Sequence, residues 1–100
     1  MAKFHLSHEA IDDLDSIWSY TFETWSEDQA DFYYHELVKA CQDIANHPTY
    51  LDKEYKEIMP GLFCHRVYKH LVFYVLIDDG VEIVRILHER MDIASKFWWI

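Results

Sequence analysis

The sequence predicts a single α+β domain in which a helical hairpin covers one face of a mostly antiparallel sheet. Residues 7–46 carry two amphipathic helical patterns in succession, and the break between them is short. Residues 62–88 are rich in β-branched and aromatic side chains, as strands are. Because a chain of 100 residues has room for only one core, the helices and the strands must share it.

Composition limits the classes of function. With 51% hydrophobic and 17% aromatic residues, the chain is expected to fold as a packed globule. Its net charge of −9 opposes attraction to phosphate backbones, so we expect no direct binding of nucleic acid by the chain alone. No apolar run approaches the ~18 residues of a membrane span, and the N-terminus lacks the apolar stretch of a secretory signal. The sequence therefore indicates a cytoplasmic protein without membrane contact.

The N-terminal half is expected to hold a short edge strand and two helices. Residues 3–6 are a strand candidate, and Ser7 is a favourable N-cap for a helix over about residues 8–24. Ser26 and Gln29 form a capping box that starts a second helix, which should end near Asn46 because His47-Pro48 disfavours continuation. The short connection makes the two helices an antiparallel αα-hairpin. The expected apolar positions are Ile11, Leu14, Ile17 or Trp18, Thr21 or Phe22, and Trp25 in the first helix, and Ala30, Tyr33 or Tyr34, Leu37, Cys41, and Ile44 or Ala45 in the second.

The C-terminal half is expected to form the sheet. Residues 71–77 are uninterrupted apolar, β-branched or aromatic, as in a strand buried on both faces, and Asp78-Asp79-Gly80 then supplies the tight turn into a strand over residues 81–88. Residues 62–68 alternate as a further strand, and residues 51–59, in the middle of the linker 48–61, could hold a helical turn. Asp92 could cap a last short helix over residues 93–98. The order is β-α-α-β-β-β, and the second sheet face would be partly open to solvent or to a partner.

Basic residues gather in the C-terminal third. Arginine and histidine on an exposed sheet face could clamp a phosphate and move a proton, so they are candidates for contact with a target. The structural alternative is that Arg85 pairs with a carboxylate and His88 caps the strand end. The target-binding candidates are Arg66, Arg85, His88 and Arg90.

No cofactor and no metal are expected. Cys64, His65, His70 and His88 lack the spacing of a zinc site, and alternation places Cys64 and His65 on opposite faces of a strand. Two glycines cannot make a glycine-rich phosphate loop, and no nucleophile motif is present. Cys41 and Cys64 are interpreted as buried thiols.

Aromatic side chains exceed what one contact between helices and sheet requires. The C-terminal aromatic run either folds back over the sheet or contributes to an interface, where tryptophan anchors are common. The partner-binding candidates are Trp18, Phe22, Phe97, Trp98 and Trp99.

Five segments resemble the ParE toxins of the RelE/ParE superfamily. Residues 6–20 (LSHEAIDDLDSIWSY) resemble the first helix of that family, and residues 25–30 (WSEDQA) resemble its helix-to-helix turn. Residues 58–62 (IMPGL) resemble the start of its second strand, and residues 70–74 (HLVFY) and 82–92 (EIVRILHERMD) resemble its closing hairpin. The resemblance spans almost the whole chain in order. Two departures are Ser26 in place of the usual glycine and the aromatic C-terminus.

The resemblance implies the toxin of a type II toxin–antitoxin pair, which traps DNA gyrase on cleaved DNA and forms a hetero-oligomer with a cognate antitoxin protein. Such a toxin is not itself an enzyme. The sister branch, RelE, cleaves messenger RNA on the ribosome with basic residues, but this chain has Leu71 and Glu89 where that pattern has arginines, and Phe97 and Trp98 in place of its late tyrosine. A ribonuclease would require Arg66, His88 and Arg90 to converge on one concave surface. A non-toxic homologue that only binds an antitoxin is the third hypothesis.

Overall fold

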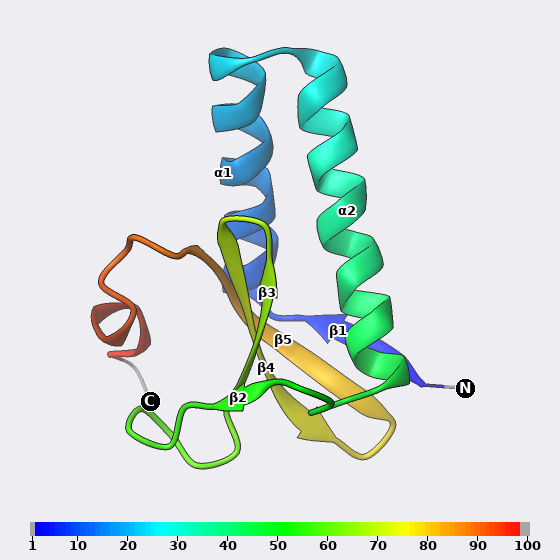
Figure 1. Ribbon diagram of the computed structural model, residues 1–100, viewed down its shortest axis with the longest axis vertical. Helices are drawn as coiled ribbons and strands as arrows, with labels where there is room; N and C mark the ends of the chain where they lie inside the picture. The colour runs from blue at the N-terminus through cyan, green and yellow to red at the C-terminus, as the bar shows by residue number, and fades with distance from the viewer. Residues whose placement is uncertain (1, 99–100) are drawn as a thin grey trace.

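The computed structural model describes residues 2–98, which form a five-stranded sheet with a helical hairpin on one face (Figure 1). This α+β architecture confirms the predicted fold class. The elements in chain order are β1 (Lys3–Leu6), α1 (His8–Thr24), α2 (Glu27–Asn46), β2 (Lys53–Glu54), β3 (Phe63–Val67), β4 (His70–Ile77), β5 (Gly80–His88) and the 3₁₀ turn η1 (Ala94–Phe97).

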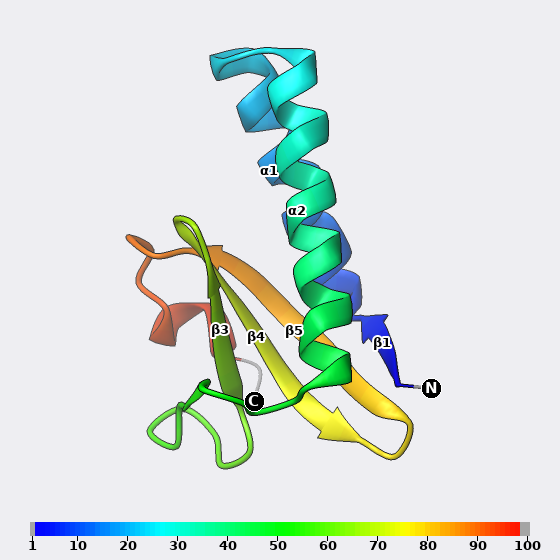
Figure 2. The same cartoon turned by 45° about the vertical axis from the view of Figure 1, so that its right-hand side comes forward.

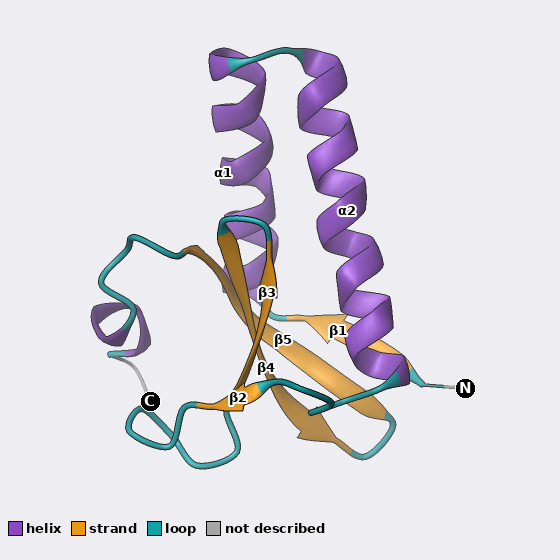
Figure 3. Cartoon of the chain, viewed as in Figure 1, coloured by secondary structure: helices purple, strands orange, loops and turns teal. Residues whose placement is uncertain are grey.

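The strands lie in the order β1-β5-β4-β3-β2 (Figure 3). All neighbouring pairs are antiparallel except β1 and β5, which run parallel, so the first strand of the chain lies at the edge beside the last. Gly80 makes this approach possible: its φ is +155°, and a Cβ there would lie 1.8 Å from the carbonyl oxygen of Lys3. Position 80 therefore requires glycine.

Both helices begin at the predicted serines. The N–H of Ala10 donates to Ser7 Oγ (3.0 Å), and the N–H of Gln29 donates to Ser26 Oγ (3.0 Å). Ser7 also connects α1 to the sheet, because its hydroxyl donates to the carbonyl of Val84 (2.7 Å). One side chain thus sets both the start of α1 and its position on β5.

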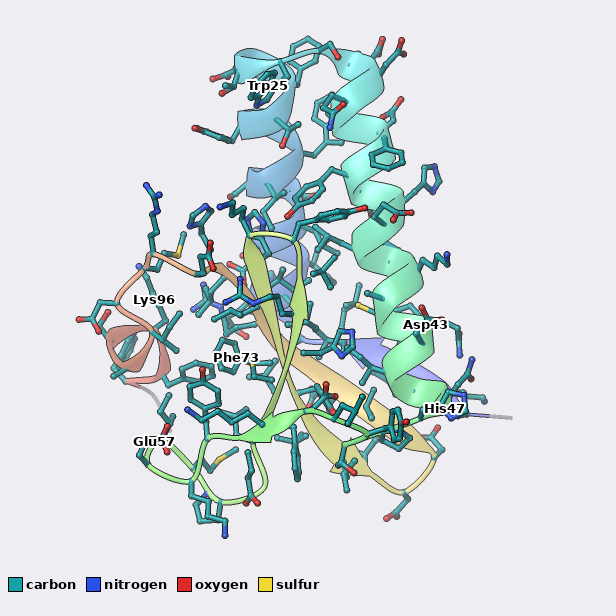
Figure 4. The ribbon with its side chains drawn as sticks, viewed as in Figure 1. Trp25, Asp43, His47, Glu57, Phe73 and Lys96 are labelled. Carbon is teal, nitrogen blue, oxygen red and sulfur yellow. The ribbon has the colours of Figure 1, made fainter. Side chains whose placement is uncertain are left out.

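The main core lies between the helical hairpin and the sheet. The predicted apolar face of α2 is confirmed, since Leu37, Cys41 and Ile44 are buried there. On α1, however, Ile11 and Trp25 are exposed, contrary to expectation. Trp25 lies at the far end of the hairpin, beyond the sheet, where nothing in the described chain covers it (Figures 1 and 4). The buried residues of α1 are Ala10, Leu14 and Thr21.

The second sheet face is not open as expected. Leu71, Phe73 and Leu87 form a second core there, and Phe97 of η1 packs on Phe73 with ring centroids 5.2 Å apart. Figure 2 shows the sheet between the helices on one side and η1 on the other. The terminal turn is 3₁₀ rather than α, and its N-cap is Ile93, without a side-chain cap from Asp92.

The linker holds the short strand β2 and, after it, a helical turn in which the N–H groups of Ile58 and Met59 donate to the carbonyl of Tyr55 (3.1 Å each). Its start is anchored by Asp52, whose carboxylate accepts from the Tyr74 hydroxyl and lies 2.8 Å from His65 Nδ1. The N–H of Thr49 in turn donates to the Tyr74 hydroxyl oxygen (2.9 Å). These bonds hold a segment in which Thr49 and Leu51 have left-handed φ values of 65° and 60°.

Fewer residues of β4 are buried than the sequence predicts. Residues Leu71 to Tyr74 are buried, whereas Leu76 and Ile77 are exposed. The end of the β4–β5 hairpin extends past the C-terminal end of α2 (Figure 1), so neither layer covers these two side chains.

A β-bulge interrupts the β4–β5 ladder. Phe73 pairs with Arg85 and Tyr74 pairs with Ile83, so Val84 is the extra residue. The bulge shifts the alternation of β5, and Ile83 and Ile86 consequently reach the same core although three positions separate them. It also places Arg85 beside α1.

Arg85 and Asp13 form a two-pronged ion pair between β5 and α1. Arg85 Nε lies 2.8 Å from Asp13 Oδ2, and Arg85 Nη2 lies 2.8 Å from Asp13 Oδ1. The N–H of Ile86 donates to the same carboxylate, and Arg85 Nη1 donates to the carbonyl of Lys96 (3.2 Å). The side chains are only 16% and 13% exposed, so the pair is shielded from water. It therefore joins α1, β5 and η1.

Removing this carboxylate should strongly destabilise the fold. In Asp13→Ala the Arg85 guanidinium would lose its counter-charge in a largely buried place, and we expect the free energy of unfolding to fall by about 3 kcal/mol. Asp12→Ala is the matched control, because Asp12 is exposed on the neighbouring position of α1. Urea denaturation of both variants measures the difference. A loss below ~1 kcal/mol in Asp13→Ala would contradict the role of the pair.

Candidate functional site

A groove with a volume of ≈ 600 Å³ separates the outer part of the helical hairpin from the end of the sheet. It exists because the hairpin extends beyond the sheet at the α1–α2 turn (Figures 1 and 2). The side chains of α1 and α2 form one wall, and the β3–β4 turn with the end of β5 forms the other. We call this feature the groove; the residues that line it include Ile17, Tyr20, Trp25, Tyr33, Tyr68, Lys69, His70, His88 and Met91.

The helical wall of the groove is aromatic. Tyr20 and Trp25 are 69% and 73% exposed, and Tyr68 is exposed on the opposite wall. Tyr33 is half-buried between them, with its ring 5.8 Å from that of Tyr68. Large aromatic side chains that remain exposed around a concave surface are typical of protein-binding sites.

Two histidines form the sheet end of the groove. His70 and His88 are cross-strand partners on β4 and β5, and their rings lie edge to face with centroids 5.2 Å apart. Tyr33 Oη lies 2.5 Å from His70 Nδ1. Burial, and secondarily the neighbouring His88 ring, lowers the pKa of His70 to about 4. His70 is therefore neutral at pH 7.

Cations near the groove are held by one carboxylate. Arg66 Nη1 lies 2.5 Å from Glu89 Oε1, and Lys69 Nζ lies 3.7 Å from Glu89 Oε2. The hydrogen bond between Arg66 and Glu89 raises the pKa of Arg66 and lowers the pKa of Glu89, as expected for an ion pair. Glu89 thus offsets much of the positive charge at this edge of the sheet.

The structure separates the four target-binding candidates. Arg85 is committed to Asp13, and Arg66 is exposed but paired with Glu89. Only His88 lines the groove; Arg90 is exposed just beyond β5, and its N–H donates to His88 Nδ1 (3.1 Å). Arg66 instead lines a shallower depression beside α2.

The partner-binding candidates also lie apart. Trp18 and Phe22 stack on α1 with ring centroids 5.2 Å apart, and Trp18 Nε1 donates to Asp31 of α2. Neither lines the groove. Phe97 is 4% exposed and serves the second core, whereas Trp98 is 82% exposed. Trp99 lies outside the described residues.

Sequence reasoning missed the groove as a site. The sequence predicts Trp25, and Tyr33 or Tyr34, as apolar positions of the two helices, and it gives Tyr20, Tyr68 and His70 no binding role. The excess of aromatic residues was the available signal, but three of them become one surface only because the hairpin extends past the sheet.

The two cysteines and the possible metal ligands of residues 2–98 are dispersed or buried. Within residues 2–98 no group of three His, Cys, Asp or Glu side chains could hold a metal ion. Cys41 and Cys64 are buried, as expected, and burial raises the pKa of both thiols to about 12. The described chain also contains no helix with the length and apolar character needed to cross a membrane.

The same fold occurs in solved structures of toxin–antitoxin systems. The chain superposes on a chain of the "Chromosomal ParDE TA system from P. aeruginosa" with a TM-score of 0.73, at 14% identity, covering 88% of this chain and 96% of that one. It also superposes on a chain of the toxin–antitoxin complex RelBE2 from Mycobacterium tuberculosis with a TM-score of 0.68, at 18% identity, covering 87% and 96%. These likenesses show that the chain has the fold of chains in solved toxin–antitoxin complexes.

Sequence similarity then identifies the branch. Residues 4–93 match the family described as "ParE toxin of type II toxin-antitoxin system, parDE". The chain is 34% identical over 93 residues to Toxin ParE1 of Mycobacterium tuberculosis, which covers 92% of this chain and 94% of that protein. It is 35% identical over 92 residues to Toxin ParE1 of Caulobacter vibrioides, again covering 92% and 94%. The chain belongs to the ParE toxin family.

The neutral state of His70 has a measurable consequence for stability. A histidine in the unfolded chain titrates near pH 6.5, whereas His70 binds its proton only near pH 4 in the fold. Between these values the unfolded chain binds more protons, so stability falls as the pH falls. We expect wild type to lose on the order of 1–2 kcal/mol more than His70→Gln between pH 7 and pH 5.

Urea denaturation of both proteins at the two pH values measures this difference. The other histidines are common to both proteins, so their contributions cancel. Equal losses of stability would show that His70 titrates normally in the fold.

Proposed function

We propose that this chain poisons DNA gyrase by trapping it on cleaved DNA, and that a cognate antitoxin holds it inactive. The observation that carries the proposal is the match of residues 4–93 to the ParE family, together with 34–35% identity to proteins named Toxin ParE1. The proposed site of action is the cytoplasm, where gyrase acts on DNA. The chain would act by binding, without a catalytic step of its own.

The surface proposed for gyrase is the C-terminal segment after β5. Arg90 and Met91 are exposed there, and Trp98 is the most exposed tryptophan among residues 2–98. Exposed arginine and tryptophan are the side chains most often responsible for binding energy in protein interfaces. Figure 1 places η1 on the side of the sheet away from α2, so an occupant of the groove would leave this end of the segment accessible, whereas Met91 lines the groove itself.

No observation favours the ribonuclease alternative. It requires Arg66, His88 and Arg90 on one concave surface, but of the three only His88 lines the groove. Glu89 also holds Arg66, so the charge that would stabilise a phosphate is largely offset.

The surface proposed for the antitoxin is the groove. It is apolar, aromatic and large enough for several side chains of a helical or extended segment. Two structural neighbours, the RelBE2 complex and the YoeB–YefM complex of Staphylococcus aureus, were solved with their antitoxins. By analogy we propose a hetero-oligomer of this toxin with a cognate antitoxin.

The gyrase proposal is tested with purified toxin, gyrase, supercoiled plasmid and ATP, scored for trapped double-strand cleavage. Linear DNA should appear in proportion to the toxin added. Arg90→Ala, or a chain ending at Phe97, should lower the linear product about tenfold at a fixed dose, as loss of an interface anchor does.

Lys3→Ala is the matched control for Arg90→Ala, because Lys3 is an exposed cation of β1 that pairs with Gly80, at the opposite end of β5 from Arg90. Circular dichroism confirms that each variant is folded. Unchanged cleavage by both C-terminal variants would move the gyrase contact elsewhere. No cleavage by folded wild type would reject gyrase poisoning and direct attention to ribosome-dependent cleavage of messenger RNA, or to a non-toxic homologue.

The antitoxin proposal is tested by one substitution in the groove. Tyr20→Glu places a charge on its aromatic wall and should weaken the co-expressed toxin–antitoxin complex at least about tenfold. Tyr50→Glu is the control, because Tyr50 is equally exposed, at 70%, but does not line the groove. Affinity is measured by calorimetry after separation of the two proteins. Equal affinities of the two variants would place the antitoxin outside the groove.

A further inference from the structure

The charge of the groove differs from that of the molecule. Acidic residues outnumber basic ones by 18 to 9 in the chain, yet none of the described residues that line the groove is Asp or Glu. Lys69 is the only lining residue with a fixed charge, and it lies at the same end as His70 and His88. A ligand that carries negative charge would therefore meet the least repulsion at this end.

The Nε2 atoms of both histidines remain available for a ligand at this end of the groove. Nδ1 of His70 is occupied by the Tyr33 hydroxyl, and Nδ1 of His88 accepts from the N–H of Arg90. Neither Nε2 atom makes a hydrogen bond within residues 2–98, and no buried side-chain nitrogen there lacks a partner, so both Nε2 atoms reach solvent. Because His88 Nδ1 accepts, the proton of its neutral ring is on Nε2, which is then a donor facing an accessible surface.

We propose that the groove binds a protein segment in which an apolar or aromatic side chain fills the Tyr20–Trp25 end and a carboxylate lies over the His70–His88 pair. This inference rests on the proposed antitoxin site and specifies the chemistry of the segment that enters it. The carboxylate would accept from His88 Nε2 and lie near the Lys69 ammonium. A segment with a cation at this position would be disfavoured, because it would face the Lys69 ammonium and leave the two histidine rings without a partner. The groove would therefore select a segment with a carboxylate there.

A protein carboxylate fits this end better than a nucleic-acid phosphate. Phosphate backbones are normally held by several cations, whereas the groove has one, in a molecule of net charge −9. The walls offer Ile17 and Met91 besides the aromatic rings, so they suit aliphatic side chains as well as flat ones.

The surroundings of the pair predict how it responds to a bound carboxylate. Asp13 of α1 and Glu89 after β5 both favour a proton on His70, but Asp13 is held by Arg85, and Glu89 by Arg66 and Lys69. Burial raises the pKa of Tyr33 of α2, so this hydroxyl adds no charge at pH 7, and the Tyr68 ring of the β3–β4 turn lies 5.8 Å from that of Tyr33. A bound carboxylate would be the nearest unpaired negative charge, so binding should raise the pKa of His70 and strengthen as the pH falls.

The test uses three small probes on the isolated full-length toxin, followed by the ring signals of its histidines in NMR spectra. Indole-3-propionate carries the aromatic group and the carboxylate, indole-3-propionamide is its neutral match, and adenosine 5′-monophosphate represents a nucleotide. At pH 6 we expect the carboxylate to bind about fivefold more tightly than the amide, with the shifts concentrated on His70 and His88.

Two variants identify the atoms responsible. His88→Phe keeps a ring but removes the donor, and it should abolish the preference for the carboxylate while retaining affinity for the amide. His35→Phe is the control, because His35 is exposed on α2 outside the groove, and it should preserve the preference. Binding should also raise the pKa of His70 in wild type.

Equal affinity for the carboxylate and the amide would overturn the proposal, as would a preference that survives in His88→Phe. Tighter binding of the nucleotide would overturn it in favour of a nucleic-acid ligand. These outcomes are independent of the Tyr20→Glu experiment. If the probes discriminate but Tyr20→Glu leaves antitoxin affinity unchanged, the carboxylate site stands and only the assignment of the antitoxin to the groove fails.

Discussion

The ion pair between Asp13 and Arg85 is the interaction on which the arrangement of the molecule depends. One carboxylate binds a guanidinium and a backbone N–H of β5, and the same guanidinium donates to the carbonyl of Lys96 in η1. A buried pair of this kind adds little stability compared with apolar residues, but it fixes geometry because its partners have no alternative. The wall of the groove on α1 and its floor on β5 are therefore held in register.

The groove follows from a difference in length between the two layers. The helices continue past the end of the sheet, and the side chains at their outer end have no strand to pack against. An apolar surface of this size is costly to leave in water, and a bound partner would cover it. The second face of the sheet has no such surface, because η1 and the linker already cover it. A partner that covers the exposed apolar surface would therefore bind on the helical side of the sheet.

Elements set by local signals could be predicted from the sequence, and features set by long-range contacts could not. Ser7 and Ser26 start their helices where their capping patterns indicate, because a cap depends on residues within one turn. The bulge at Val84 has no such signature, since it is defined against β4, and without it Arg85 cannot be placed beside Asp13. The docking of Phe97 and the convergence of Tyr20, Trp25 and His70 likewise depend on the packed layers. The family resemblance predicted the class of protein but not the site.

The parallel pairing of β1 with β5 affects the order in which the molecule can be made. The backbone N–H of Lys3 donates to the carbonyl of Asp79, and Lys3 pairs with Gly80. β1 is therefore synthesised well before β5, the strand with which it pairs. Asp13 is likewise synthesised well before Arg85, its partner in the ion pair. During synthesis the helical hairpin has emerged while its sheet does not yet exist, and its apolar face is open to any binding protein nearby. Synthesis thus provides an interval in which the hairpin is accessible before the sheet, and with it the C-terminal segment, is complete.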